Sequence, residues 1–105
     1  MNWSDSEPNG PIDFSKEGKL MLSAIEALGE RFGLSTPAMF LTGSKDQKIA
    51  RFTRIKLYGE GKYRKLNWWK AFGKLLLYEG YLAEESIQGF FGSVVRLSDR
   101  GTQWM

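Results

Sequence analysis

A group of basic and polar residues in this 105-residue chain has the composition of a phosphate-binding surface. Basic side chains recur every three residues after a serine, and two further lysines lie four residues apart in a later segment. The candidate residues are Ser44, Lys45, Lys48, Arg51, Lys70 and Lys74. Lysine and arginine bind phosphate by charge, serine adds hydrogen bonds, and helix N-termini add unpaired N–H groups. Lysine has poor geometry for reading bases, so the pattern predicts backbone contacts with little sequence preference.

The net charge of +3 is concentrated in one quarter of the chain. Residues 45–70 hold nine Lys or Arg and two Asp or Glu, a net charge of +7. Residues 1–44 carry a net charge of −3, and residues 71–105 carry −1. A concentrated basic block is typical of a protein with a polyanionic partner. The alternative is a solvated, solubilising surface.

Two adjacent phenylalanines, Phe90 and Phe91, lie between glycines in the stretch IQGFFGSVV at 87–95. The flanking glycines predict a turn or hairpin tip, where large rings face water. An exposed ring can stack on a base or wedge against a terminal base pair. Successive strand residues point to opposite faces, so we expect the two rings to act differently, with one of them folded back onto the core.

Residue types that enzymes and metal sites commonly use are missing here. The chain has no cysteine and no histidine, which excludes disulfides, zinc–thiolate sites and the usual general base, and a reducing compartment fits best. The stretch GEGK at 59–62 fails as a phosphate loop because Tyr63 stands where serine or threonine is required. The adjacent Glu84 and Glu85 would point to opposite faces of a strand. We therefore expect no catalytic residue, no metal and no cofactor.

The first half of the chain predicts a leader and several short elements. Residues 1–14 are acidic, contain two prolines and show no periodicity, so we expect a flexible leader before one domain at 15–105. Helical periodicity begins at Ser15, the expected N-cap, and continues to Gly33. Two elements are expected next: a short buried strand at Ala38–Leu41 and a second helix at about Lys45–Lys56, with Ile49 and Phe52 facing inward. No apolar run approaches the ~20 residues of a membrane-spanning helix.

The second half predicts a helix, a hairpin and a short terminal helix. The third helix begins near Leu66, is capped by Asn67, and stops at Gly80, with Trp69 and Phe72 on its inward face. Two strands and a capped turn follow: Leu82–Ser86, Ser93–Leu97, and a terminal helical turn that Ser98 caps and that contains Trp104.

This order of elements predicts an α+β fold, the winged helix, in which a two-stranded β-wing follows a helix-turn-helix core. A three-helix core without a wing is the alternative, and it would leave the strand-like residues 94–97 unexplained.

Several short motifs resemble those of one known family. They are LGERFG at 28–33, FLTGS at 40–44, LYGEGK at 57–62, WWKAF at 68–72 and EGYL at 79–82. Together they resemble the RQC domain of RecQ-family DNA helicases, most closely of the Werner syndrome helicase type. The similarity extends from about Asp13 to Trp104.

The resemblance implies a winged helix that binds double-stranded DNA ends, forks and junctions. It places Phe91 at the position that separates the terminal base pair, and Ser44, Lys48 and Lys70 at phosphate-binding positions. It also implies a nuclear, monomeric accessory domain without enzymatic activity of its own. The ATPase domains would lie upstream in the same protein, an ATP-dependent 3′–5′ DNA helicase of repair, replication and recombination.

Some positions depart from the family pattern. Thr42 stands where the Werner-type domain has a phosphate-binding arginine, so Lys45 or Arg51 would supply that charge. Phe90 replaces a lysine, and Gly92-Ser93 replaces a Met-Lys pair beside the tip aromatic. The spacing between positions 50 and 58 is one residue shorter.

A second function class fits the same residues. A winged helix can serve as a protein–protein adaptor, and the phenylalanine tip would then dock in an apolar groove of a partner. Salt titration separates the two, because a DNA binder loses affinity steeply with salt and an apolar tip does not.

Overall fold

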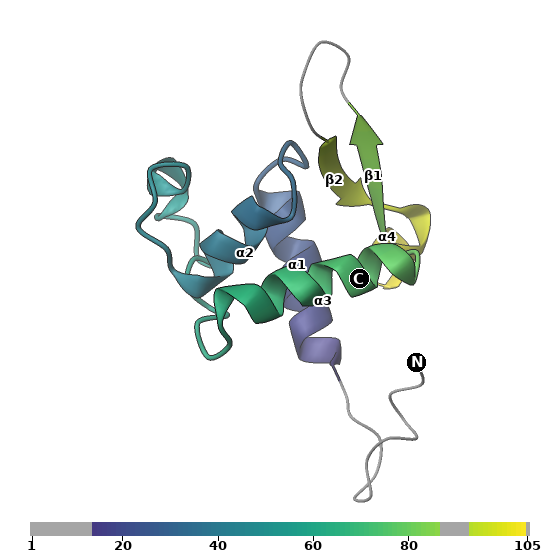
Figure 1. The fold of residues 1–105 in the computed structure, drawn as a ribbon, viewed down its shortest axis with the longest axis horizontal. Coiled ribbons are helices and arrows are strands. Elements are labelled where there is room, and N and C mark those ends of the chain that lie inside the picture. The colour runs from purple at the N-terminus through teal and green to yellow at the C-terminus, as the bar shows by residue number, and fades with distance from the viewer. Residues whose placement is uncertain (1–13, 87–92, 105) are drawn as a thin grey trace, which may run out of the picture.

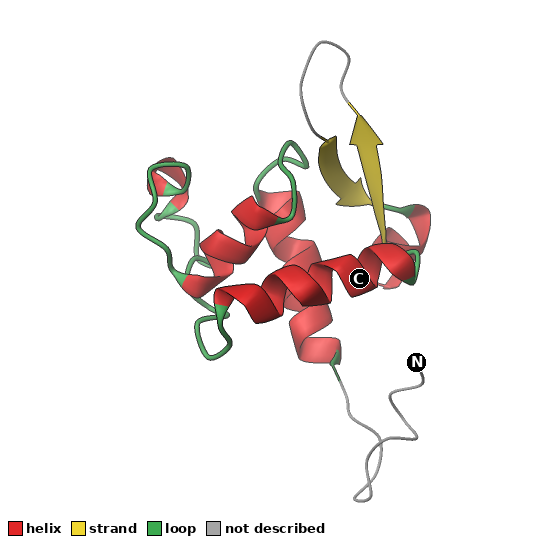
Figure 2. Ribbon diagram, in the orientation of Figure 1, coloured by secondary structure: helices red, strands yellow, loops and turns green. Residues whose placement is uncertain are grey.

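The computed structural model describes residues 14–86 and 93–104. They contain helices, one two-stranded antiparallel sheet, and the loops and turns that connect them (Figure 1). The elements in chain order are α1 (Ser15–Ala27), α2 (Ser35–Thr42), the 3₁₀ helix η2 (Ala50–Phe52), α3 (Leu66–Tyr78), β1 (Leu82–Ser86), β2 (Ser93–Leu97) and α4 (Asp99–Trp104). The helices gather on one side and the hairpin projects beside them, which confirms the predicted winged-helix fold (Figure 2).

Helix α1 is shorter than its hydrophobic pattern predicts. Phe14 is the N-cap and Ser15 is already helical, so the predicted serine cap is wrong. The helix ends at Ala27 because Gly29 (φ 88°) and Glu30 (φ 55°) adopt left-handed conformations that reverse the chain. The N–H of Glu30 donates to the carbonyl of Ile25 (3.0 Å), which satisfies one free carbonyl at this helix end.

The predicted strand at Ala38–Leu41 is wrong, because these residues lie in helix α2. Four apolar residues in a row do not distinguish a buried strand from a buried helix. Pro37 is tolerated in the first turn, where its missing N–H would have had no intrahelical partner. The helix ends at Gly43, whose φ of 74° is left-handed.

The predicted helix at about Lys45–Lys56 is also wrong. This segment is a succession of turns, in which the N–H groups of residues 49, 52, 55 and 58 each donate to the carbonyl three residues earlier (2.8–3.1 Å). Only Ala50–Phe52 forms a regular 3₁₀ helix. Ile49 and Phe52 are buried, as predicted, so the apolar residues follow a period of three rather than 3.6.

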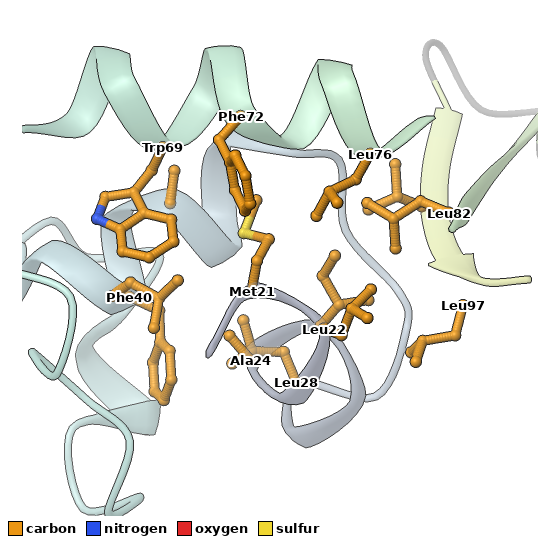
Figure 3. Close-up of a cluster of buried hydrophobic side chains, with 14 of the residues drawn as sticks. Met21, Leu22, Ala24, Leu28, Phe40, Trp69, Phe72, Leu76, Leu82 and Leu97 are labelled. Atoms are coloured by element: carbon orange, nitrogen blue, oxygen red, sulfur yellow. The ribbon is translucent and has the colours of Figure 1, made fainter. Parts of the chain in front are cut away.

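Helix α3 contributes several large side chains to the core. Its N-cap is Lys65, whose side chain makes no capping bond, so the predicted Asn67 cap is wrong. Its end is as predicted, because Gly80 (φ 89°) reverses the chain after Tyr78. Figure 3 shows Trp69, Phe72 and Leu76 projecting from α3 toward α1.

The wing hairpin agrees with the sequence at both described strands. β1 and β2 pair in register from Leu82 opposite Leu97 to Ser86 opposite Ser93. The outer edge of β2 is not free, because the N–H of Val95 donates to the carbonyl of Phe32 (2.8 Å). Two side-chain bonds complete this region: the N–H of Leu97 donates to the Glu30 carboxylate (2.8 Å), and the N–H of Gly101 donates to the hydroxyl of Ser98 (3.1 Å), the predicted cap of α4.

Trp69 joins the core to the loop before α3. Its side chain is fully buried, and its indole N–H donates to the carbonyl of Gly61 (2.7 Å). A Cβ on Gly61 would lie 2.6 Å from the indole ring, so no other residue fits without movement. Trp68 is half-buried and stacks on Phe72, with ring centroids 4.9 Å apart.

We predict that Trp69→Ala destabilises the domain by about 3–5 kcal/mol or unfolds it, because it removes a large buried ring. Urea unfolding followed by circular dichroism measures the loss. Trp104→Ala is the control and should cost less, because that ring is 41% exposed. An unchanged melting curve for Trp69→Ala would contradict the assignment of this ring to the core.

We predict that Gly61→Ala costs about 1–3 kcal/mol, because a methyl group would overlap the buried Trp69 ring. Gly73→Ala is the matched control. A Cβ at position 73 would meet only the flexible ends of Leu34 (2.7 Å) and Met21 (2.9 Å), and alanine gains about 1 kcal/mol of helix propensity in the middle of α3. Equal melting temperatures for the two variants would show that the Trp69 ring can move.

Candidate nucleic-acid interface

The segment that follows α2, residues 44–56, carries most of the predicted phosphate-binding residues, and we call it the basic segment. Ser44 is half-buried, whereas Lys45, Lys48 and Arg51 are exposed. The successive three-residue turns bring residues three apart onto the same side of the segment, because side chains at i and i+3 eclipse at this pitch. Ile49 and Phe52 face the core, whereas Lys45, Lys48 and Arg51 are exposed, and we call these three cations the basic row.

Local hydrogen bonds fix the start of the basic segment. The hydroxyl of Ser44 accepts from the N–H of Asp46 (3.1 Å), and the Asp46 carboxylate accepts from the N–H of Lys48 (2.8 Å). Such side-chain bonds compete with helix formation, which explains why an α-helix does not begin here. The Ser44 O–H still has its proton to donate, so it can hydrogen-bond a phosphate oxygen.

Longer-range hydrogen bonds tie the basic segment to the end of α2. The hydroxyl of Tyr58 lies 2.9 Å from the carbonyl oxygen of Gly43 and 2.8 Å from that of Ser44. The N–H groups of Gly59 and Gly61 donate to carbonyls near the end of α2, at 2.9 and 2.8 Å. The basic row is therefore held at both ends although it contains little regular structure.

Within the part of the chain that the structure describes, no carboxylate lies within ion-pair distance of the cations of the basic segment. Among residues 14–86 and 93–104, the ion pairs are Arg64 with Glu17 (3.8 Å) and Arg96 with Glu85 (3.6 Å). Arg51 instead has its guanidinium 5.0 Å from the centroid of the Phe52 ring. Lysines without carboxylate partners are available to an external anion.

The remaining predicted anchors lie on a different element. Lys70 is half-buried and Lys74 is exposed, and both belong to α3, which contains no acidic residue. The Trp69–Gly61 hydrogen bond connects α3 to the loop that follows the basic segment. Phe90 and Phe91 lie outside the described residues, so their placement at the wing tip stays a prediction.

One polar cluster was not predicted from the sequence. The hydroxyl of Tyr63 donates to the buried Glu17 carboxylate (2.9 Å), and the Arg64 guanidinium lies 4.1 Å from the Trp68 ring centroid. Burial, together with the hydrogen bond to Glu17, raises the pKa of Tyr63 to about 12. The sequence indicated only that Glu17 suits the helix dipole. These contacts connect the loop before α3 to α1, so the role of the cluster is structural.

The described part of the chain lacks two further features. It contains no group of three acidic, histidine or cysteine residues placed to hold a metal ion. It also contains no helix with the length and apolar character needed to cross a membrane.

Comparison with known proteins agrees with the geometry. A family model described as the RQC domain matches residues 8–105. The chain belongs to the RQC domain family. This RQC domain is 32% identical over 94 residues to the bifunctional 3′-5′ exonuclease/ATP-dependent helicase WRN of Mus musculus, and the match covers 89% of the chain. It is 33% identical over 109 residues to the ATP-dependent helicase wrn-1 of Caenorhabditis elegans, and the match covers the whole chain.

The RQC domain is a small part of these relatives. It spans 7% of the mouse protein and 10% of the nematode protein. A third relative, from Acanthamoeba polyphaga mimivirus, is named for an ATP-dependent RNA helicase; it is 33% identical over 93 residues, which are 85% of the chain and 17% of that protein.

Proposed function

We propose that this RQC domain binds double-stranded DNA ends, forks and junctions through backbone phosphates, as the accessory DNA-binding domain of a RecQ-type helicase. The observation that carries the proposal is the solvent-facing row of unpaired cations on the basic segment. A row of this kind binds a phosphate backbone without reading bases. Membership of the RQC family supports the same conclusion.

The phosphate contacts would come from side chains of different kinds. Lys45, Lys48 and Arg51 provide charge, and the Ser44 hydroxyl provides a hydrogen-bond donor. Thr42 contributes no charge, and its hydroxyl lies 3.1 Å from carbonyl oxygens within α2. We propose that Lys45 or Arg51, on the basic segment, supplies the charge that Thr42 lacks.

The strand-separating role is proposed for the wing. Its two strands, β1 and β2, project from the helical body (Figure 1). Opening one terminal step loses about 1.4 kcal/mol of stacking on average. An aromatic–base contact returns about 1–3 kcal/mol. One ring, Phe91, can therefore offset one opened step, and Phe90 has the secondary role.

Extended unwinding would need energy from outside this domain. The mouse and nematode relatives are named as ATP-dependent helicases. We infer that this domain works as a monomer beside upstream ATPase domains of a 3′–5′ DNA helicase in the nucleus. In that arrangement the RQC domain holds and opens the duplex end, and the ATPase moves the opened strand.

We predict that Lys48→Ala and Lys70→Ala each weaken duplex DNA binding equally for all sequences. Each should lower the slope of log K against log salt by about one unit, because one phosphate contact is lost. Fluorescence anisotropy with blunt and forked duplexes at several salt concentrations measures this. Lys19→Ala, an exposed lysine on α1, is the control and should bind like wild type.

Three results would each contradict part of this proposal. A normal slope in either variant would make that lysine a solvated surface charge. Salt-insensitive binding by the wild-type domain would favour the protein–protein adaptor. Tighter binding to duplex RNA than to duplex DNA would make RNA, and not DNA, the nucleic acid that this domain binds.

We predict that Phe91→Ala keeps most of its affinity for blunt duplex DNA but no longer opens the terminal pair. Affinity comes mainly from phosphates, whereas opening needs a ring to replace lost stacking. The fluorescence of 2-aminopurine at the end base reports opening. Phe90→Ala should have the smaller effect, because strand alternation would place its ring on the opposite face from Phe91. Normal opening by Phe91→Ala would refute the wedge, and greater sensitivity of Phe90→Ala would move the role to Phe90.

A further inference from the structure

The outer face of α3 is turned away from the core. An α-helix rotates by about 100° per residue. Trp69, Phe72 and Leu76 project to the core (Figure 3), so the opposite side is centred on residues 67, 71, 74 and 78. We use the name "outer face of α3" for Asn67, Lys70, Ala71, Lys74 and Tyr78. Lys70, at the edge of this face, is half-buried, and the other four are exposed.

Tyr78 is the least covered large side chain on this face. It is 82% exposed, compared with 49% for Tyr63 and 41% for Trp104. Its ring makes no contact with another aromatic ring among the described residues. A single exposed aromatic residue is common on protein surfaces. What distinguishes Tyr78 is that Lys74 lies one turn before it, on the same side of the helix.

The charge of the outer face fits a polyanion. Helix α3 has two lysines and no acidic residue, and neither lysine has a carboxylate within ion-pair distance in the described part of the chain. Acidic residues begin only after the helix, with the half-buried Glu79. On β1, Glu85 is paired with Arg96 (3.6 Å), and Glu84 is exposed. These carboxylates limit the basic surface at the C-terminal end of α3.

We propose that the outer face of α3 binds single-stranded DNA, with Lys74 on a phosphate and the Tyr78 ring stacked on a base. Stacking on a side chain requires a base whose face is uncovered, which a single strand offers and the interior of a duplex does not. Residues 74 and 78 are about 6 Å apart along the helix axis, so one nucleotide can contact both side chains.

The position of α3 suggests where this strand comes from. The helix begins beside the loop that follows the basic segment and ends three residues before β1, at the base of the wing (Figure 1). A strand released from a duplex end at the wing would therefore meet Tyr78 next. The proposal rests on the proposed function in this respect, and single-strand binding itself can be tested without it.

The test compares Tyr78→Ala with Tyr78→Phe, which keeps the ring. Fluorescence anisotropy is measured with an oligothymidine single strand and with a blunt duplex. We expect Tyr78→Ala to weaken single-strand binding about 5- to 150-fold, which corresponds to about 1–3 kcal/mol. Tyr78→Phe should bind the single strand like wild type, and blunt-duplex affinity should stay within about twofold for both variants. Thermal melting should not fall, because Tyr78 is exposed and alanine favours a helix.

Either of two results would overturn the inference. Unchanged single-strand affinity in Tyr78→Ala would show that the ring stacks on no base. Equal losses with single strand and blunt duplex would assign the outer face of α3 to duplex contact. Failure of the proposed function gives a different result, namely normal blunt-duplex binding and an unchanged salt slope in Lys48→Ala.

Discussion

The hydrogen bond from the buried Trp69 indole to the Gly61 carbonyl (2.7 Å) fixes the arrangement on which the rest of the structure depends. The ring lies against Gly61, whose N–H in turn donates to the Leu41 carbonyl in α2 (2.8 Å). One side chain therefore connects α3, the loop after the basic segment, and α2. The cations of the basic segment and those of α3 are therefore held in fixed relative positions, because the Trp69 ring packs directly against Gly61.

The sequence predicted well the elements whose patterns are long or unambiguous. The strands Leu82–Ser86 and Ser93–Leu97 and the end of α3 agree with the structure. Helix α2 was missed because four consecutive apolar residues fit either a strand or a helix. The basic segment was read as an α-helix because its two inward residues, Ile49 and Phe52, are three apart, a spacing that fits a period of 3.0 as well as one of 3.6. The side-chain bonds of Ser44 and Asp46 leave no periodic signal in the sequence.

The candidate site was predictable in its composition but not in its arrangement. Charge and residue type selected Lys45, Lys48 and Arg51, and the structure leaves all three exposed. The sequence could not show that they lie in a row of turns, since that depends on Tyr58, fourteen residues away, contacting the start of the segment. Tyr78 was not among the predicted site residues, although the helical period places it opposite Trp69 and Phe72. Its 82% exposure depends on how the neighbouring elements pack, which the sequence does not show.

An aromatic wedge alone leaves an opened duplex end close to balance. The stacking lost at one step is about 1.4 kcal/mol, and the ring returns a similar amount, so the end closes again as easily as it opens. A second contact that binds only the released strand would shift this balance, because a ligand changes an equilibrium only by its preference for one state. The proposed phosphate contacts on the basic segment would lack that preference, since they would form with open and closed ends alike. The proposed stacking on the outer face of α3 would supply it, because a base could stack on Tyr78 only after the pair has opened.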